Sequence, residues 1–415
     1  MNIAVVGSGI SGLVTAYLLS DEHAVTVYEA GSHIGGHTHT HDISHGGLNY
    51  NVDTGFIVFN ERTYPNFIKL MSRLGVEWQP SEMSFSVKCY KTGLEFSPST
   101  LNSIFAQRRN IFRPAFYRML LDALRFRREA GELSVTDRQY EQTLDQYLIE
   151  NKYSAWFIDY FIVPMGSAIW SADPDRFRKF PVRYFAEFFV KHGFLNIKDQ
   201  PRWLVIKGGS KQYVEPLTRG FRDNIRLNCG VHKIRRSKAS VEIQAGGLAP
   251  ETYDSVVIAT HSDQALALLD DPSEQEKDIL GAIDFQENDT VLHTDDTLLP
   301  RKQAAWAAWN YHIPLDGRRR VAVTYDMNIL QSLDAAAEFC VTLNMTDAIA
   351  PEKIIKRLTY HHPVYTPGSL AARRRYAEIN GQNRTYYCGA YWFYGFHEDG
   401  VKSGLEVGKL FGKTI

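Results

Sequence analysis

The sequence predicts an α/β fold with a Rossmann-like domain and a second, discontinuous α+β domain. The apolar run Ile3–Val6 leads directly into the glycine-rich stretch Gly7–Gly12 and then into a helical pattern. A second strand-like run, Ala24–Tyr28, ends at an acid, Glu29. The chain has 415 residues, which is too long for one ordinary core, so two domains are expected.

The stretch Gly7-Ser8-Gly9-Ile10-Ser11-Gly12 has the spacing of a dinucleotide-binding turn between a buried strand and a helix. Gly7 makes the turn, Gly9 lets the backbone approach a pyrophosphate, and Gly12 lets the helix pack closely on the strand. A phosphate is favoured at the helix N-terminus by free N–H groups and the helix dipole. Glu29 lies close to the ~20-residue spacing at which a carboxylate binds a ribose. These residues predict a dinucleotide site.

A second glycine pair, Gly35-Gly36, follows the acid, and the segment Gly31–Thr38 resembles the extended fingerprint of the flavin-containing amine oxidase superfamily. This superfamily also contains phytoene desaturases and protoporphyrinogen oxidases. Its members usually have arginine after the glycine pair, where this chain has His37. The segment Asn51–Phe56 resembles the loop that lies against the flavin ring in the family. The resemblance implies that the nucleotide is FAD.

The same resemblance extends to the C-terminal strand and helix, which in the family return to the pyrophosphate and to one edge of the flavin. Most members have an acid or a hydroxyl where Ala390 and Tyr391 stand, so the ribityl contact is expected to differ. The positions carried over as cofactor-binding, in addition to Gly7–Gly12 and Glu29, are Ala30, Gly35, Gly36, His37, Thr38, Thr54, Gly55, Phe56, Ile57, Val231, Gly389, Ala390, Asp399, Gly400 and Val401.

The expected FAD-binding domain, of the glutathione-reductase type, comprises residues 1–80, 203–284 and 365–415. Residues 81–202 and 285–364 are expected to form the substrate domain. The pattern of 84–96 predicts a hairpin, and alternating runs between 285 and 360 predict an antiparallel sheet.

Residues 101–130 are strongly basic and amphipathic. Seven arginines oppose only Asp122 and Glu129, and apolar residues lie between them. One interpretation is helices packed on the body of the enzyme with a solvated cationic face. The other is peripheral contact with a membrane, arginines on the headgroups and aromatic rings below them.

The composition excludes several classes of protein. A net charge of −1 gives no global attraction to nucleic acid. The four cysteines are isolated in sequence, so neither a metal site nor a disulfide framework is indicated. The chain starts with a strand, and no apolar run is long enough to span a bilayer. We therefore expect a cytoplasmic protein, at most peripheral on the inner membrane face.

The C-terminal motif, Gly-Phe-His-Glu-Asp-Gly, most closely resembles that of a bacterial subgroup of NAD/FAD-binding oxidoreductases. Members of this subgroup are found beside cyclopropane-fatty-acyl-phospholipid synthase genes. This resemblance implies hydride transfer from carbon to the flavin, and association with a lipid methyltransferase or cyclopropane synthase. We predict His397 and Glu398, with His293, as catalytic residues. His261 is interpreted as a loop residue outside the chemistry.

Three functions remain open on the sequence. The first is an FAD-dependent oxidase or desaturase acting on an apolar substrate, a methylated fatty acyl chain of a membrane lipid. Dense aromatic residues between 156 and 194 and the basic region motivate it. The second is a soluble amine or amino acid oxidase. The third is a non-catalytic flavin-binding partner of a lipid-modifying enzyme.

Overall fold

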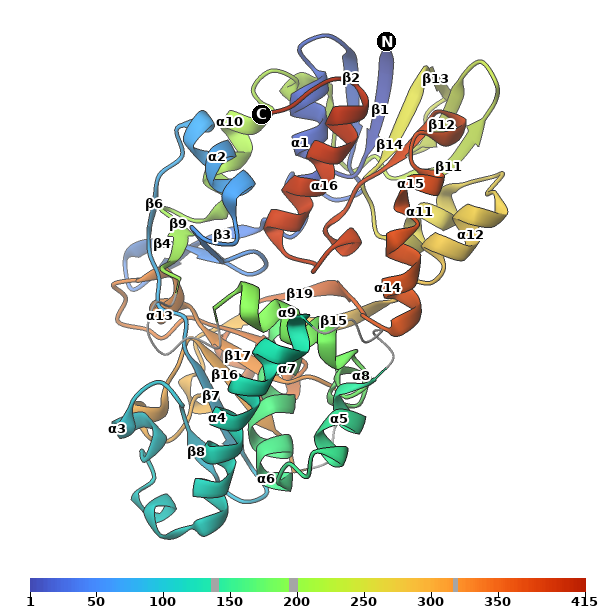
Figure 1. Ribbon diagram of the computed structural model, residues 1–415. Helices are drawn as coiled ribbons and strands as arrows, with labels where there is room; N and C mark the ends of the chain where they lie inside the picture. The colour runs from blue at the N-terminus through green and yellow to red at the C-terminus, as the bar shows by residue number, and fades with distance from the viewer. Residues whose placement is uncertain (136–141, 194–200, 316–319) are drawn as a thin grey trace.

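The computed structural model describes residues 1–135, 142–193, 201–315 and 320–415. The elements from both ends of the chain form one part of the molecule, drawn at the top of Figure 1. The elements between residues 214 and 280 also belong to this part. Most of the remaining elements form a second part below it, and β19 (Ile354–Pro363) and β15 (Phe285–His293) lie where the two parts meet (Figure 1).

The first part is built on a five-stranded parallel sheet in the order β10-β2-β1-β14-β20. Its first two strands in the sequence match the predicted runs. The strands are β1 (Asn2–Val6), β2 (Ala24–Tyr28), β10 (Ile225–Arg226), β14 (Ser255–Ile258) and β20 (Thr385–Tyr387). An antiparallel sheet adjoins them, with β11 (Val231–Arg236), β12 (Val241–Ala245) and β13 (Glu251–Tyr253).

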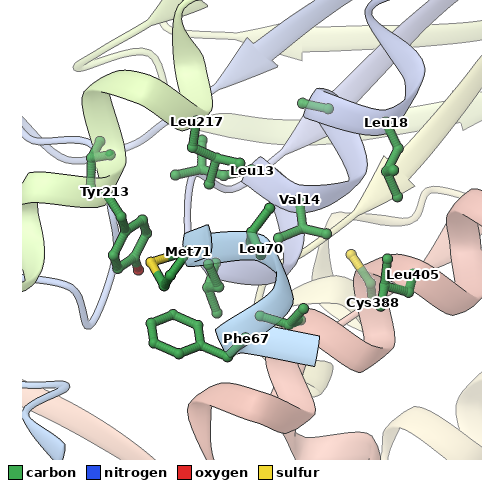
Figure 2. Packing of buried hydrophobic residues seen from close by; sticks show 14 of the residues in the cluster. Leu13, Val14, Leu18, Phe67, Leu70, Met71, Tyr213, Leu217, Cys388 and Leu405 are labelled. Atoms are coloured by element: carbon green, nitrogen blue, oxygen red, sulfur yellow. The ribbon is translucent and has the colours of Figure 1, made fainter. Parts of the chain in front are cut away.

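Helices cover this sheet, and α1 (Ile10–Leu19) and α16 (His397–Leu410) lie side by side on it (Figure 1). Figure 2 shows the buried core on this face, where side chains of α1 meet those of three neighbouring helices. Leu13 and Val14 pack there against Leu70, Leu217 and Leu405. The other helices of this part are α2 (Pro65–Leu74), α10 (Val214–Thr218), α11 (Ser262–Leu268), α12 (Glu274–Leu280), α14 (Pro367–Arg374) and α15 (Tyr376–Ile379).

The second part contains a seven-stranded sheet in the order β19-β15-β18-β17-β16-β7-β8. Only the β16–β7 pair is parallel, so the predicted antiparallel sheet and the predicted hairpin, β7 with β8, are confirmed. The strands are β7 (Phe85–Cys89), β8 (Glu95–Phe96), β15 (Phe285–His293), β16 (Trp309–Ile313), β17 (Val323–Asp326), β18 (Cys340–Leu343) and β19 (Ile354–Pro363).

A helical layer lies beside this sheet, and its aromatic side chains form a second core. The helices are α3 (Leu101–Ile104), α4 (Pro114–Val135), α5 (Leu144–Glu150), α6 (Ala155–Phe157), α7 (Val163–Trp170), α8 (Pro174–Phe177) and α9 (Val182–Lys191), and α13 (Met327–Gln331) lies elsewhere on the sheet. None of the helices described is both long and apolar enough to cross a membrane.

Two small antiparallel sheets connect the parts. One pairs β3 (Thr40–His45) with β4 (Leu48–Asp53). In the other, β9 (Trp203–Ile206) lies between β5 (Val58–Asn60) and β6 (Trp78–Pro80). The side chain of Gln331 in α13 is bound to β4, because its amide oxygen accepts a 2.8 Å hydrogen bond from the Asp53 N–H group. The two parts are thereby linked at several points around the site.

Candidate cofactor and substrate site

Two glycines form the tight turn after β1, and a side chain at either position would clash with neighbouring backbone atoms. Gly7 has φ of +106°, and a Cβ atom there would lie 2.9 Å from the Ala259 carbonyl oxygen. A Cβ atom on Gly12 would lie 2.1 Å from the Gly7 carbonyl oxygen. The first turn of α1 therefore packs directly on the end of the sheet, with its N-terminus toward a large cavity.

Glu29 lies at the end of β2 and lines the same cavity. Its carboxylate accepts hydrogen bonds from the Ser8 N–H group at 2.9 Å, from the Ser8 hydroxyl at 2.5 Å and from the Gly31 N–H group at 2.7 Å. These donors fix the carboxylate beside the glycine turn. This is the place that the spacing predicts for a ribose contact.

The second glycine pair brings two further loops together. A Cβ atom on Gly36 would lie 3.0 Å from Gly9 Cα, and one on Gly55 would lie 2.0 Å from the His37 carbonyl oxygen. The Phe56 N–H group also donates to the His37 carbonyl oxygen at 2.8 Å. Segments 7–12, 35–38 and 54–57 are thus stacked on one another at one wall of the cavity.

His37 is the residue that replaces the usual arginine. Burial lowers the pKa of His37 to about 4, so its ring is neutral at neutral pH. Its Nε2 atom is buried and has no hydrogen-bond partner among the described residues, although the ring lines the cavity. A buried nitrogen without a partner is costly, so a bound group that supplies one is favoured here.

The start of α16 closes the cavity from the C-terminal side. The His397 ring stacks on Phe56 at a centroid distance of 3.6 Å, and its Nε2 atom shares a 2.7 Å hydrogen bond with the Tyr213 hydroxyl. The same hydroxyl is hydrogen-bonded to Thr38. Burial holds the pKa of His397 well below its usual range. The imidazole is therefore neutral and fixed in orientation.

The cavity has a volume of about 710 Å³, and the three separated segments of the chain all contribute to it. Most predicted cofactor-binding residues line it. These are Gly7, Ser8, Gly9, Ile10, Ser11, Glu29, Ala30, Gly35, Gly36, His37, Thr54, Gly55, Phe56, Ile57, Val231, Gly389 and Ala390.

Beyond these residues the wall is aromatic and aliphatic. Glu29 is the only Asp, Glu, Lys or Arg among the described residues that line the cavity. Burial lowers the pKa of His192 to about 4 and the pKa of His362 to about 3, so these rings are neutral too. The residues of this region include Tyr64, Met83, Ile169, Trp170, Phe188, His192, Trp203, Phe285, Trp309, Tyr325, Leu343, Tyr360, His362, Tyr365, Tyr394 and Phe396.

Comparison with known proteins identifies the family. The family model described as "Flavin containing amine oxidoreductase" matches residues 10–297, which is more than half of the chain. The chain belongs to this family. It is an FAD-dependent oxidoreductase, and the segments that line the cavity fit the cofactor through the glycine turns, the Glu29 carboxylate and the free His37 nitrogen.

Solved structures show the same fold at low sequence identity. Cyclohexylamine oxidase from Brevibacterium oxydans IH-35A is 15% identical, with 99% of this chain and 98% of that chain covered and a TM-score of 0.69. A CLA-producing fatty acid isomerase from P. acnes is 17% identical, with the same coverage and a TM-score of 0.71. Putrescine oxidase bound to putrescine is 14% identical, with 99% of each chain covered and a TM-score of 0.69. No curated protein sequence matches the chain significantly.

Five of the residues predicted to bind the cofactor do not line the cavity but support its wall. A Cβ atom on Gly400 would lie 2.5 Å from Ile10, so Gly400, like Gly12, permits close packing around α1. Asp399 accepts a 2.9 Å hydrogen bond from the Phe396 N–H group and caps α16, and Thr38 holds Tyr213. Val401 is fully buried in the core beside α1. For these positions the predicted direct contact is corrected to a supporting role.

The prediction of His293 as a catalytic residue is wrong. Its side chain is fully buried and does not line the cavity. Nδ1 accepts from the Asp295 N–H group at 3.0 Å, and Nε2 is hydrogen-bonded to the Thr342 hydroxyl at 2.7 Å. Neighbouring residue Leu292 faces the opposite side of the sheet from His293, toward β3 and β4. Both ring nitrogens are therefore used in holding the sheet together.

Glu398 also does not line the cavity, where the predicted catalytic role would place it. Its carboxylate accepts hydrogen bonds from the Asn66 N–H and side-chain amide groups at 3.1 and 2.6 Å and from the Phe67 N–H group at 2.8 Å. The two backbone donors are free N–H groups at the start of α2. Glu398 thus caps α2, and only His397 of the predicted catalytic residues lies at the cavity.

Residues missed from the sequence come mainly from the end of β19. The Tyr360 hydroxyl is hydrogen-bonded to Thr54 at 2.7 Å, and His362 Nδ1 accepts from the Asn288 amide at 2.8 Å. His261, interpreted above as a loop residue outside the chemistry, lines the cavity and stacks on Phe285 at 4.2 Å. The run Tyr360-His361-His362, which has an aromatic residue and two histidines in succession, was the available signal. The described residues hold no cluster of His, Cys, Asp or Glu suited to a metal ion.

Proposed function

We propose that the protein oxidises a neutral, apolar substrate, and that this substrate is a methylated fatty acyl chain of a membrane lipid. The observation that carries the proposal is that, beyond the Glu29 carboxylate at the glycine turn, no Asp, Glu, Lys or Arg of the described residues lines the cavity. An ammonium group or a carboxylate buried there would lose its hydration without gaining an ion pair, which costs several kcal/mol. A hydrocarbon chain would instead gain from burial against aromatic rings.

The cofactor and the protein have different roles in the proposed reaction. Bound FAD supplies the hydride acceptor. The protein excludes water through Trp170, Phe188 and Tyr394, which are packed together beside the cavity. His397 is a weak base because burial lowers its pKa, so its role is to present a neutral ring of fixed orientation at the start of α16. Loss of a hydride from one carbon and a proton from its neighbour, which together balance the reduction of FAD to FADH2, would leave an alkene.

The solved structures contain support for two substrate classes. The fatty acid isomerase shows that this fold accommodates an acyl chain. The cyclohexylamine and putrescine oxidases favour the alternative of an amine oxidase. Among the residues that the structure describes, the cavity offers no carboxylate apart from Glu29, which is bound by Ser8 and Gly31, to pair with an ammonium group. The lipid proposal is therefore preferred.

The test is anaerobic mixing of the FAD-loaded protein with candidate substrates. Methyl-branched phospholipids should bleach the flavin and lose the mass of two hydrogens from the acyl chain, whereas cyclohexylamine and putrescine should leave the flavin oxidised. Ile169→Trp, which fills the cavity, should prevent bleaching, and Ile355→Trp on the exposed part of β19 should not. Rapid bleaching by an amine would favour the alternative function. No bleaching by any substrate would favour a non-catalytic flavin-binding partner.

A further inference from the structure

The helices α3 and α4, with the 3-10 helix η1 (Arg108–Phe112) between them, carry an exposed surface that the catalytic site does not explain. Residues 101–130 contain seven arginines against Asp122 and Glu129, while the whole chain has a net charge of −1. Positive charge is therefore concentrated on this segment. It lies at the end of the molecule away from the parallel sheet (Figure 1).

Helix α4 has two apolar stripes instead of one. Phe116, Met119 and Phe126 face inward and are buried in the aromatic core. Tyr117, Leu121 and Leu124 point outward, with exposed fractions of 42, 62 and 55%. A helix on a soluble protein normally has a polar outer face, so the second stripe indicates a partner.

Two further apolar side chains, in η1 and α3 before α4, are also exposed. Phe112 is 85% exposed and Leu101 is 78% exposed. We call these two side chains, together with Tyr117, Leu121 and Leu124, the outer apolar stripe. A large aromatic ring exposed to this degree gains free energy on entering an apolar phase.

The two acids of the segment are used internally. Asp122 is buried and accepts from the Ser154 N–H group at 2.9 Å. Glu129 accepts from the hydroxyls of Tyr147 and Tyr153 and pairs with Arg125. Both carboxylates are thereby directed toward the protein and leave the outer face cationic.

Arg108 and Arg109 beside the stripe bind no carboxylate among their hydrogen-bond partners in the described structure, whereas Arg118 pairs with Asp122 at 3.3 Å. Arg108 donates to the Phe105 carbonyl and to Asn102, and Arg109 donates to the Gly93 carbonyl and to Gln107. Their positive charge remains available to an anionic partner. Guanidinium groups bind phosphate oxygens especially well.

We propose that the outer apolar stripe and its arginines dock the protein on the surface of an anionic phospholipid bilayer. Arginines would bind headgroup phosphates, and Phe112, Leu121 and Leu124 would enter the boundary of the acyl region. Charge complementarity selects this partner over a neutral apolar surface. The absence of a spanning helix among the described residues makes the contact peripheral.

The surface lies one helix layer from the cavity. The inner stripe of α4 packs on α9 within the aromatic core, and Phe188 of α9 lines the cavity. Docking would therefore hold the cavity close to the bilayer. The proposal does not depend on the identity of the substrate, because the evidence for it comes from the outer face alone.

The test is sedimentation of the FAD-loaded protein with vesicles of phosphatidylglycerol and phosphatidylcholine, compared with vesicles of phosphatidylcholine alone. Binding should require the anionic lipid and weaken with salt. Phe112→Ser with Leu121→Ser should reduce partitioning about ten-fold or more. Arg109→Gln with Arg128→Gln should reduce it by about five-fold for each arginine.

Matched variants separate docking from general effects. Leu48→Ser with Leu248→Ser removes two exposed leucines elsewhere, and Lys238→Gln with Arg219→Gln removes two exposed cations elsewhere. Both should bind as the unchanged protein does. Equal binding to both vesicles, no binding, or equal loss in the matched variants would overturn the proposal. So would a dimer that Phe112→Ser dissociates, because a second copy would then cover the stripe. Flavin bleaching by dispersed lipid is measured separately and does not enter these outcomes.

Discussion

At the scale of single residues, one hydroxyl joins two walls of the cofactor site. Tyr213 is fully buried at the packed face shown in Figure 2 and bonds both Thr38 of the second glycine loop and His397 of α16. Removing this hydroxyl would leave two buried polar groups without a partner, which costs roughly 1–3 kcal/mol. The orientation of His397 thus depends on a residue remote from it in the sequence.

We therefore predict that Tyr213→Phe lowers the free energy of unfolding by about 1–3 kcal/mol in urea titrations. Tyr365→Phe is the matched control, because Tyr365 is equally buried and its hydroxyl has no hydrogen-bond partner in the described structure. The control should change stability by well under about 1 kcal/mol. Equal losses in the two variants would show that the Tyr213 hydroxyl bonds contribute nothing specific.

The residue scale also explains why local sequence predicts the glycine turn but not which side chains reach the cavity. Gly7 and Gly12 are fixed by local backbone sterics, which the sequence contains. The side that His293 faces depends on the register of β15 with β18, and a shift of one residue would reverse it. Glu398 follows His397 directly, but adjacent residues of a helix point in different directions. One therefore reaches the cavity and the other reaches α2.

At the scale of elements, the contact between α1 and α16 joins the two ends of the chain. A Cβ atom on Gly404 would lie 2.8 Å from the Ser11 carbonyl oxygen and 3.1 Å from Val14 Cβ. Gly400 approaches Ile10 equally closely. The glycines of α16 can be read from the sequence. Their packing role depends on the contact of this helix with α1, which the sequence does not show. Both helices begin at the cavity, so their separation sets its width.

We expect Gly404→Ala to force the two helices apart and to lower the free energy of unfolding by about 1–3 kcal/mol. FAD should also dissociate more readily, measured as free flavin after gel filtration. Gly368→Ala in α14 serves as control, because its Cβ atom would meet Thr366 at an ordinary 3.7 Å. Alanine should stabilise that helix by up to about 1 kcal/mol. A Gly404→Ala protein of unchanged stability and flavin content would contradict the close packing.

At the scale of the whole molecule, buried histidines and buried acids change the free energy of unfolding in opposite directions as the pH changes. Burial lowers the pKa of His293 to about 4 and the pKa of His312 to about 3. They lie in one hydrogen-bonded row across the sheet with Thr324 and Thr342. Burial similarly lowers the pKa of His37 and His192 to about 4 and of His261 and His362 to about 3. This distribution follows from tertiary packing and is not visible in the sequence.

Three buried carboxyl groups have the opposite effect on the pH dependence of the free energy of unfolding. Burial raises the pKa of Asp53 to about 6 and the pKa of Asp399 to about 7, and it raises the pKa of Asp326, which lies beside Glu338. A histidine with a lowered folded pKa contributes stability that is present above about pH 6.5 and lost as the pH falls. A carboxyl group with a raised folded pKa contributes stability that is present below about pH 4 and lost as the pH rises through the folded value.

The histidines outnumber these acids, so the free energy of unfolding should have its maximum near about pH 7 and fall by several kcal/mol toward about pH 5. Between about pH 7 and 8 only the acids still act, and stability should decline gently. Urea titrations across this range give the number of protons taken up on unfolding. His312→Gln should reduce that number on the acid side by about one. Asp399→Asn, which can still accept from the Phe396 N–H group, should instead raise it by up to about one between about pH 4 and 7, where Asp399 is protonated only in the folded protein. Stability that rises below pH 7 would mean that the buried imidazoles are charged in the folded protein, and the neutral cavity wall inferred above would then be wrong.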